Sequence, residues 1–319
     1  MKVVYCIKYG SHEDLEIRDI DPPGPPDEAQ VKVDLKARGI QFSDLVRIAG
    51  EYQDSSSLPF VVGGEAAGII AEVGPGVTDF AVGDRVMAPG GCVEQINIST
   101  RAVTKVPEGV DLNVAASFRN NYTTAYYGMQ RANLKPGETL LVHGAAGGVG
   151  LAAVDIGKLY GARVIGTASS DEKLAVVTKL GADHVINYND GFRDQVKELT
   201  NGRGADVIYD PVGGDVFDES MRCIAPFGRI LIVGFTSGRA ALAKTNHLLV
   251  KDVAVIGYSI GGLQRHNPAQ SEKNSRTLID WLATGRISPF ISHLMSMDDV
   301  IEGYQLLVDR KVVGKVILN

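Results

Sequence analysis

Residues 140–150 read LLVHGAAGGVG, an apolar strand that runs directly into a loop with four glycines. Because glycine lacks a Cβ, the loop can take positive φ angles and let a large group approach its backbone. Ala145, Gly147 and Gly150 occupy the three key positions of an AxGxxG pattern. In dinucleotide sites these positions serve the tight turn, the approach of the pyrophosphate and the packing of helix on strand. A helix that begins in such a loop offers free N–H groups and a partial positive charge. The stretch therefore predicts a pyrophosphate site at a helix start.

Apolar strands and amphipathic helices alternate after this loop. Apolar residues recur at the spacing of one helix face, at Val149, Ala153, Ile156 and Tyr160. Gly161 is a helix stop, and a second helix is expected between an N-cap at Ser170 and a stop at Gly181. Later strands are expected in HVINY, ADVIYDPVGG, RILIVGF and VAVIGYSI. This alternation predicts right-handed crossovers and a parallel sheet covered on both faces, which is an α/β, doubly wound Rossmann fold.

The sequence on either side of this region differs in character. The first hundred residues are rich in turn signals between short β-rich runs, at residues 31–35, 67–73, 84–87 and 102–106, and predict a compact β-domain. Residues 261–275 are polar and read as turns, and residues 276–287 predict an amphipathic helix. A chain of 319 residues is long enough for two domains. We expect residues 1–119, completed by 259–319, to form one domain and residues 120–258 to form the Rossmann domain.

Composition excludes several classes of protein. Hydrophobic residues make up 45% and charged residues 22%, so the chain is expected to fold fully. A net charge of -6 argues against a broad nucleic-acid surface. The start of the sequence alternates like a strand and carries early acidic residues, and no apolar run approaches the ~20 residues of a membrane span. Cys6, Cys92 and Cys223 form no CxxC pair and are expected to be buried thiols. We expect a cytoplasmic protein.

The end of the second Rossmann strand, GTASSDEK at residues 166–173, bears on the cofactor. An NAD site places a carboxylate there for the ribose 2′-hydroxyl, but Ser169 and its neighbours supply none. Lys173 offers a positive charge that suits a 2′-phosphate. Asp171 and Glu172 weaken the argument. On balance the stretch favours NADPH over NADH.

Several blocks of this sequence occur in an order and at spacings that are typical of one protein family. They are QFSDLVRIAGEY (41–52), LPFVVGGEAAGIIAEVGPGVTDFAVGDRV (58–86), NNYTTAYYGM (120–129), KLGADHVINY (179–188), YDPVGG (209–214) and TNHLLVKDVAVIGYS (245–259). With the glycine loop they resemble the zinc-independent quinone oxidoreductases of the medium-chain dehydrogenase/reductase superfamily. The resemblance implies a GroES-like β-barrel as the first domain, with the active-site cleft between it and the cofactor domain.

The resemblance also implies that no metal is bound. Zinc-dependent relatives carry a Cys near Gln41, a His at Gly64 and a second Cys near Asn120, and only Glu65 remains of that set here. The cysteine-rich structural lobe of those relatives is also missing. Zinc needs thiolate or imidazole ligands, which these positions do not offer.

By the same resemblance, particular residues contact the cofactor. The pyrophosphate is expected at Gly147, Gly148 and Val149, and the 2′-phosphate at Lys173 and Tyr188. Ala146 and Ser169 are expected to bind the cofactor as well. Val233, Gly234 and Phe235 match the segment beside the nicotinamide, with Thr124 on its other side.

Without zinc, the chemistry expected is hydride delivery to an acceptor that is already electron-poor. Gln41 stands where family members commonly have Asn, and it can donate an N–H to the acceptor. Tyr52 is a candidate proton donor, although it is equally explained as a surface residue of the barrel. Asn120, Asn121 and Tyr126 are weaker candidates, since an Asn at a helix start is often only a cap.

His143 and the pair Asp44 and Arg47 are not expected to take part in catalysis. His143 adjoins the glycine loop, but at the buried end of a parallel strand it is expected to be a hydrogen-bonded core residue. Asp44 and Arg47 are expected to form a local pair.

Three functions remain open at this point. The first is an NADPH-dependent reductase of small-molecule quinones, and the second is a reductase of enals, enones or enoyl thioesters. The third is an NADPH-binding scaffold or sensor without turnover. In each case the apolar run at the end of the central sheet, VAVIGYSI, predicts a homodimer joined at sheet edges.

Overall fold

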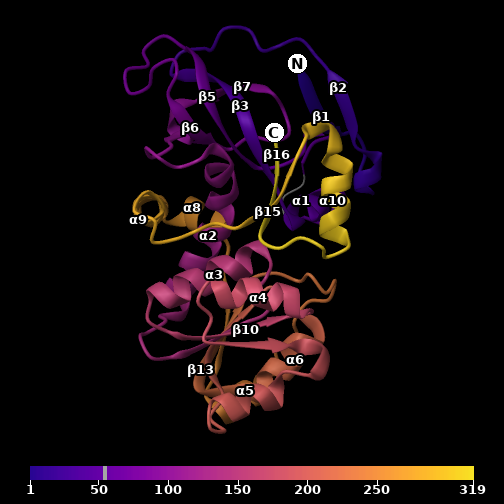
Figure 1. Cartoon of the computed structure of the whole chain (residues 1–319), viewed down its shortest axis with the longest axis vertical. Helices are drawn as coiled ribbons and strands as arrows, with labels where there is room; N and C mark the ends of the chain where they lie inside the picture. Colours follow the sequence, from indigo (N-terminus) through magenta and orange to yellow (C-terminus); the bar gives the residue numbers. More distant parts are fainter. Residues whose placement is uncertain (53–55) are drawn as a thin grey trace. The chain divides into compact units, whose positions relative to one another are not determined.

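A computed structural model of the chain describes residues 1–52 and 56–319 (Figure 1). The chain divides into two compact units. Residues 1–119 and 289–319 form the first, called here the β unit, and residues 120–288 form the second, called the Rossmann unit. Each unit is described by itself.

The Rossmann unit is built on a six-stranded parallel sheet in the order β11-β10-β9-β12-β13-β14. Its strands are β9 (Thr139–Val142), β10 (Arg163–Ala168), β11 (His184–Asn187), β12 (Ala205–Asp210), β13 (Ile224–Ile232) and β14 (Ala254–Gly257). Its helices are α3 (Gly148–Leu159), α4 (Asp171–Lys179), α5 (Arg193–Leu199), α6 (Gly214–Cys223), α7 (Thr245–Lys251), α8 (Ile260–His266) and α9 (Pro268–Ala283). The predicted doubly wound sheet is confirmed.

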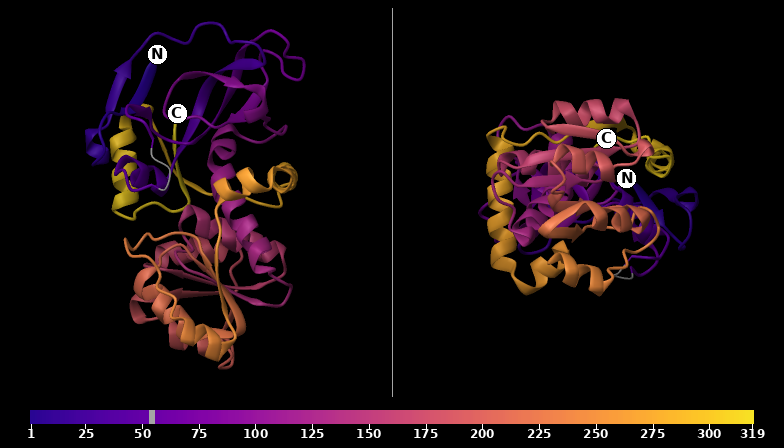
Figure 2. Two further views of the ribbon diagram at one scale, coloured as in Figure 1. Left: turned by 180° about the vertical axis from the view of Figure 1, so that it is seen from behind. Right: turned by 90° about the horizontal axis from the view of Figure 1, so that it is seen from below.

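Helices cover both faces of this sheet, as the views from opposite sides show (Figure 1 and Figure 2). On one face, Leu141 and Ile165 pack in one core cluster with Val196 of α5 and Phe217 of α6. On the other face, α3 and α4 come so close to the strands that small residues are required. A Cβ on Gly157 would lie 2.6 Å from Leu140 Cδ2, and one on Gly166 would lie 2.6 Å from Val177 Cγ1.

Glycines and cap residues end and begin the helices as the sequence predicts. Ser170 caps α4, its hydroxyl accepting from the Lys173 N–H at 3.4 Å. Gly161 and Gly181 follow the ends of α3 and α4 with φ of +74° and +103°, which only glycine adopts without strain.

The Rossmann unit runs on to Ser288, beyond the expected boundary at residue 258. The polar stretch at 261–275, expected to consist of turns, is helical, because Ser259 and Asn267 cap α8 and α9. Helix α9 then packs against the end of α2 (Leu112–Ala132). Gln130 and Asn274 exchange side-chain hydrogen bonds of 3.0 and 2.9 Å, and the rings of Tyr126 and Trp281 meet edge to face at 5.2 Å. These contacts assign the segment to the Rossmann unit.

The β unit holds a seven-stranded sheet and a three-stranded sheet. The larger sheet follows the order β15-β16-β3-β5-β6-β8, with β7 paired to β3, and the smaller follows β2-β1-β4. The strands are β1 (Lys2–Cys6), β2 (Glu16–Asp19), β3 (Gln30–Ile40), β4 (Phe60–Val61), β5 (Glu65–Val73), β6 (Arg85–Ala88), β7 (Gln95–Ser99), β8 (Thr104–Lys105), β15 (Ile291–Met295) and β16 (Lys315–Leu318). Helices α1 (Phe42–Ile48) and α10 (Val300–Val308) complete it. The C-terminal strand β16 pairs with β3 and so returns to the first domain, as predicted.

All three cysteines are buried and unpaired, which confirms the expectation from their spacing. Within residues 1–52 and 56–319, no helix has both the length and the apolar character to cross a membrane.

Candidate active site

The glycine loop between β9 and α3 is a tight turn against the sheet. Gly144 takes a φ of +55°, and the Ala145 N–H donates to the Thr167 carbonyl of the neighbouring strand at 2.9 Å. A Cβ on Gly150 would lie 2.2 Å from the Gly144 oxygen and 2.8 Å from the Ala145 Cα. Both are backbone atoms that cannot move aside, so the close packing of helix on turn requires glycine at position 150.

The first turn of α3 is shaped to receive an anion. Its N-cap is Gly147, which has no side chain to occupy the free N–H groups, and its first residue is Gly148. A Cβ on Gly148 would lie 2.5 Å from Asn121 Nδ2 and 3.0 Å from Asn121 Oδ1. The cradle therefore fits a dinucleotide pyrophosphate, for which a bare helix N-terminus is the usual site.

The residues expected near the 2′-phosphate lie at the carboxyl ends of β10 and β11. Register pairs Ala168 with Asn187, so Ser169 and Tyr188 each follow directly on neighbouring strands. The Ser169 carbonyl accepts from Asn189 Nδ2 at 2.9 Å, which ties the two strand ends together. Lys173 lies in the first turn of α4. The structure thus gathers Ser169, Lys173 and Tyr188 at one edge of the sheet.

Asp171 is the acidic residue that complicated the choice of cofactor. Its Oδ1 accepts from Asn187 Nδ2 at 3.2 Å, so this carboxylate is directed toward the end of β11. Strand β10 itself ends at Ala168 with no carboxylate. The end of β10 therefore lacks the acceptor that an NAD site usually offers to a free 2′-hydroxyl.

Val233, Gly234 and Phe235 follow β13 and form the next loop along this edge. The Val233 N–H donates to the Asp210 carbonyl at 2.9 Å, and the Thr236 N–H donates to the Pro211 carbonyl at 3.1 Å. The loop after β13 is therefore held to the loop after β12, next to the position between β9 and β12 where the strand order reverses. Ligands of doubly wound sheets bind at such a reversal.

Thr124 and its two candidate neighbours lie well inside α2, not at a helix start. The helix begins at Leu112, so Asn120 and Asn121 are not caps, in contrast to the alternative drawn from the sequence. The Thr124 hydroxyl donates to the Asn120 carbonyl at 2.7 Å, which leaves its oxygen as an acceptor. Asn121 is 7% exposed, and its contact with Gly148 was not foreseen, since nothing in the sequence indicates which face of α2 meets the loop.

Asp210, at the end of β12, is another residue of this region that the sequence did not predict. It is fully buried, and its Oδ1 accepts from the N–H groups of Val212 and Gly213 at 2.8 and 2.9 Å. Burial raises the pKa of this carboxyl, and the two N–H bonds oppose the rise. The carboxylate shapes the turn that the loop after β13 is bonded to. Its only sequence signal was a polar residue closing an apolar strand.

Gln41 lies in the β unit, where a buried polar cluster surrounds it. Lys315 Nζ donates to Gln41 Oε1 at 3.1 Å and pairs with Glu65 Oε1 at 2.9 Å. The Gln41 N–H donates to Asp44 Oδ2 at 2.9 Å, and the Tyr304 hydroxyl donates to the same oxygen at 3.3 Å. We call these five residues the Gln41 cluster. The sequence pointed to Gln41 and Glu65 but not to Lys315 or Tyr304, which lie far along the chain.

The charge on Asp44 should make stability depend on pH. Burial raises the pKa of Asp44 from an ordinary 3.8 to about 6, against the opposing influence of Lys315, the Gln41 N–H and Arg47. Between these two values the folded state binds more protons than the unfolded state, so the free energy of unfolding falls as pH rises and levels off above about pH 6. The difference between the two pKa values corresponds to a fall of about 3 kcal/mol in the free energy of unfolding. Asp44→Asn should remove this fall, and urea unfolding at several pH values between 4 and 7 would measure it. An equal pH slope in both proteins would contradict the assignment.

Asp44 and Arg47 do not form the expected contact pair, although the charge of Arg47 still lowers the pKa of Asp44. Asp44 faces inward to Gln41 and Tyr304, while the Arg47 guanidinium lies over the Tyr52 ring with its Cζ 5.2 Å from the centroid. The one-turn spacing predicted that the two residues are near each other, but not that Asp44 is buried and hydrogen-bonded to other partners. Tyr52 is 38% exposed, so it lies at the surface of the β unit.

His143 is a core residue, as predicted. It is 1% exposed, and its ring nitrogens lie 3.1 Å from Thr167 Oγ1 and 2.8 Å from Ser220 Oγ. Burial lowers its pKa to about 3, so the ring is neutral at ordinary pH.

The Gln41 cluster does not fit a zinc ion. A carboxamide and a glycine stand where thiolate and imidazole ligands are needed, and an ammonium pairs with the remaining carboxylate. In the part of the chain that the structure describes, no three His, Cys, Asp or Glu side chains are grouped as metal ligands.

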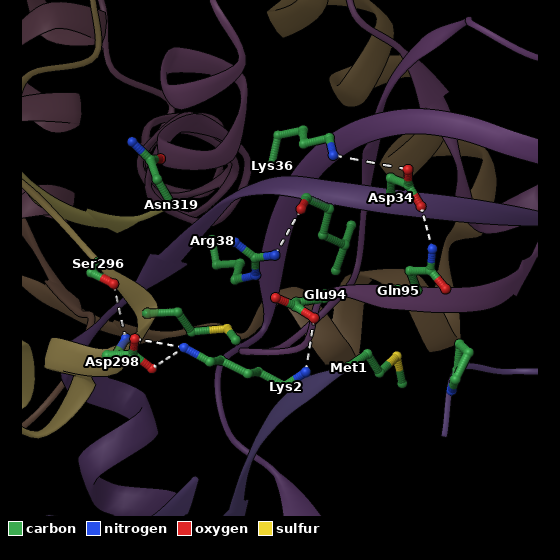
Figure 3. A pocket seen from close by; sticks show the side chains of 13 residues that line it. Met1, Lys2, Asp34, Lys36, Arg38, Glu94, Gln95, Ser296, Asp298 and Asn319 are labelled. Carbon is green, nitrogen blue, oxygen red and sulfur yellow. Dashed lines mark hydrogen bonds and ion pairs between the residues drawn. The ribbon is translucent and has the colours of Figure 1, made fainter. Parts of the chain in front are cut away.

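A surface pocket of about 540 Å³ in the β unit lies apart from all the predicted site residues (Figure 3). Its charged side chains neutralise one another: Lys2 pairs with Asp298 at 2.6 Å, and Lys36 lies 3.9 Å from Asp34. Arg38 donates to the carbonyls of Val93 and Leu35. Such internal pairing does not indicate a ligand site.

Comparisons with known proteins agree with this geometry. Residues 27–131 match the alcohol dehydrogenase GroES-like domain, and residues 148–283 match the family described as zinc-binding dehydrogenase. A quinone oxidoreductase-like protein 2 homolog of Nematostella vectensis is 40% identical, over 91% of this chain and 82% of its own. A 2-haloacrylate reductase of a Burkholderia species is 33% identical, over 92% of each chain. The Escherichia coli quinone oxidoreductase, solved in complex with NADPH, is 31% identical, with a TM-score of 0.90 over 100% of this chain and 99% of its own.

Fold, loop geometry and these likenesses together define an oxidoreductase of the medium-chain dehydrogenase/reductase type. Within that superfamily the chain belongs to the zinc-independent quinone oxidoreductase family.

Proposed function

We propose that this chain reduces quinones with hydride from NADPH. The observation that carries the proposal is the Gln41 cluster, in which a carboxamide held by a buried ammonium replaces the metal ligands of the zinc enzymes. A carboxamide donates a hydrogen bond but is no strong Lewis acid, so it suits an acceptor that is already electron-poor.

NADPH is the cofactor, and when bound it supplies a hydride. The solved relative from Escherichia coli contains NADPH, and the strand ends of this chain offer the chemistry for its phosphates. We assign the pyrophosphate to Ala146, Gly147, Gly148 and Val149 and the 2′-phosphate to Ser169, Lys173 and Tyr188. We assign the nicotinamide to Val233, Gly234, Phe235 and Thr124.

On the acceptor, Gln41 Nε2 would donate to the carbonyl oxygen on which negative charge grows during hydride transfer. One fixed donor of this kind typically contributes ~10²-fold or more to the rate. The hydroxyl of Tyr52, a residue that is 38% exposed, would deliver the proton that completes the reduced product.

A second candidate is reduction of an activated C=C bond that bears a carboxylate. The 2-haloacrylate reductase among the relatives acts on such a compound by its name, and one observation here favours the same class. The Arg47 guanidinium lies over the Tyr52 ring, which places a positive charge beside the proposed proton donor. An arginine in this position would suit an anionic acceptor.

Acceptor competition separates these functions. We expect NADPH oxidation with 1,4-benzoquinone to exceed that with 2-chloroacrylate and with a crotonyl thioester by at least tenfold in kcat/KM. A preference for 2-chloroacrylate that is lost in Arg47→Met would establish the second candidate instead. Tight NADPH binding with no oxidation by any of the three would indicate a scaffold or sensor.

We also propose a homodimer formed through the edge strand β14. Leu249 and Val250, in helix α7 shortly before this strand in sequence, are 79% and 82% exposed. Exposed apolar side chains and a strand at the end of a sheet both favour association. Leu249→Glu/Val250→Glu should give a folded monomer by light scattering coupled to size exclusion. Leu294→Glu, an exposed apolar position in the β unit, is the control. A monomeric wild-type protein would contradict the proposal.

A cytoplasmic location is proposed as well. Three buried cysteines without a disulfide support a reducing compartment.

A further inference from the structure

Lys315 is a buried lysine on the last strand of the β unit. Its side chain is 3% exposed, and it contacts two groups: Glu65 Oε1 at 2.9 Å and Gln41 Oε1 at 3.1 Å. The Glu65 side chain is 6% exposed, so this ion pair is shielded from water on both sides. Buried charges of this kind are rarely retained unless they are paired and also hydrogen-bonded.

The backbone makes room for this pair at one position. A Cβ on Gly39 would lie 2.8 Å from Lys315 Cε and 3.1 Å from Glu65 Cγ, and only 2.4 Å from the Ala116 oxygen. Both charged side chains therefore cross the same glycine of β3. The packing fixes where the ammonium can lie.

The chemistry of an ammonium then decides how the Gln41 carboxamide is oriented. Lysine has three donors and no acceptor, so it can bind only the oxygen of a carboxamide and never its nitrogen. With Oε1 bound to Lys315, Nε2 is directed the other way. There it lies beside Gly64, whose Cβ, if built, would lie 3.7 Å from Nε2. Glycine at this position leaves the nitrogen side of the carboxamide without a neighbouring side chain from residue 64.

The other end of Gln41 is held just as firmly. Its N–H donates to Asp44 Oδ2 at 2.9 Å, and that oxygen also accepts from the buried Tyr304 hydroxyl at 3.3 Å. Backbone and side-chain oxygen are thus each fixed by a buried charged group. These contacts restrict the orientation of the Gln41 side chain, and they determine the direction in which Nε2 points.

We propose that Lys315 is a positioning residue, which fixes the Gln41 carboxamide so that Nε2, not Oε1, is the atom presented to the acceptor oxygen. Glu65 serves as the counter-ion that permits the ammonium to be buried. This inference rests on the proposed function, because it assigns Gln41 its role as donor to the acceptor.

Removing Lys315 alone would leave Glu65 buried without a counter-ion, so the test replaces both residues. In Lys315→Met/Glu65→Met the pair becomes apolar side chains of similar volume, a change that buried ion pairs commonly tolerate. Lys32→Met/Glu72→Met is the control: it removes a second lysine–glutamate pair of β5, with the lysine on β3, that does not contact Gln41.

Two readouts are needed. The first is kcat for 1,4-benzoquinone, which we expect to fall at least tenfold in Lys315→Met/Glu65→Met while the KM for NADPH stays within twofold of wild type. The second is the side-chain NH₂ signal of Gln41 in ¹⁵N-resolved NMR spectra, assigned by its loss in Gln41→Leu. We expect it to shift in the Lys315 variant and to stay in place in the Lys32 variant.

The outcomes separate this inference from the function on which it rests. An unchanged Gln41 NH₂ signal, or a shifted signal with kcat within twofold of wild type, would overturn the positioning role. If the wild-type protein reduces no acceptor, the proposed function fails, and the NMR comparison alone then decides whether Lys315 orients Gln41.

Discussion

Gly150→Ala is expected to lower the free energy of unfolding by about 3 kcal/mol, the upper part of the usual cost of overpacking. The added methyl group would lie 2.2 Å from the Gly144 oxygen and 2.8 Å from the Ala145 Cα. Neither atom can rotate away, so α3 must move off β9 and the phosphate cradle opens. Urea unfolding would give the stability change, and fluorescence titration would give the accompanying loss of NADPH affinity.

Gly147→Ala is the matched control for that substitution. Its backbone, with φ of -75° and ψ of 168°, is open to alanine, and the nearest neighbour of the new Cβ would lie 3.3 Å away. We expect stability within about 1 kcal/mol of wild type. The NADPH dissociation constant should nevertheless rise at least tenfold, because the methyl group narrows the approach of the pyrophosphate. Equal losses of stability in both variants would contradict the separate roles given to the two glycines.

Lys173→Ala is expected to raise the dissociation constant for NADPH by ten- to a hundredfold and to leave that for NADH within twofold. A hydrogen-bonded charge contributes about 1.5–3 kcal/mol, and only NADPH carries the 2′-phosphate that Lys173 would meet. Isothermal titration with both nucleotides measures the difference.

Lys179→Ala controls for the loss of a positive charge from the same helix, since Lys179 lies in its last turn and is exposed. It should bind both nucleotides like wild type. An equal loss of NADPH and NADH affinity in Lys173→Ala would show that Lys173 does not contact the 2′-phosphate.

Much of the Rossmann unit could be predicted because its signals are local. The glycine loop, the cap at Ser170 and the stops at Gly161 and Gly181 each depend on the backbone needs of a few adjacent residues. Strand order follows from alternation and crossover handedness. The helices α8 and α9 were not foreseen, because Ser259 and Asn267 lie in a polar stretch where caps and turns use the same residue types.

The sequence predicted only some of the residues of the candidate site in the β unit. Gln41 could be singled out from its position in a motif, but its partners come from strands and helices hundreds of residues away. Lys315 lies in GKVILN, which reads as an apolar terminal strand, and Tyr304 lies on a separate helix. The spacing of apolar residues predicts which face of a helix or strand is buried. It does not predict which distant helix or strand packs on that face. For the same reason the sequence did not indicate that Asp44 is buried and accepts from Gln41 and Tyr304.

The most direct test of the account is NADPH oxidation by 1,4-benzoquinone after exhaustive treatment with a metal chelator. We predict multiple turnovers per chain, one NADPH oxidised for each quinone reduced, at the same rate as before chelation. NADH should be oxidised at least tenfold more slowly. Loss of turnover on chelation with recovery on adding zinc, or firm NADPH binding without oxidation by the quinone, would contradict it.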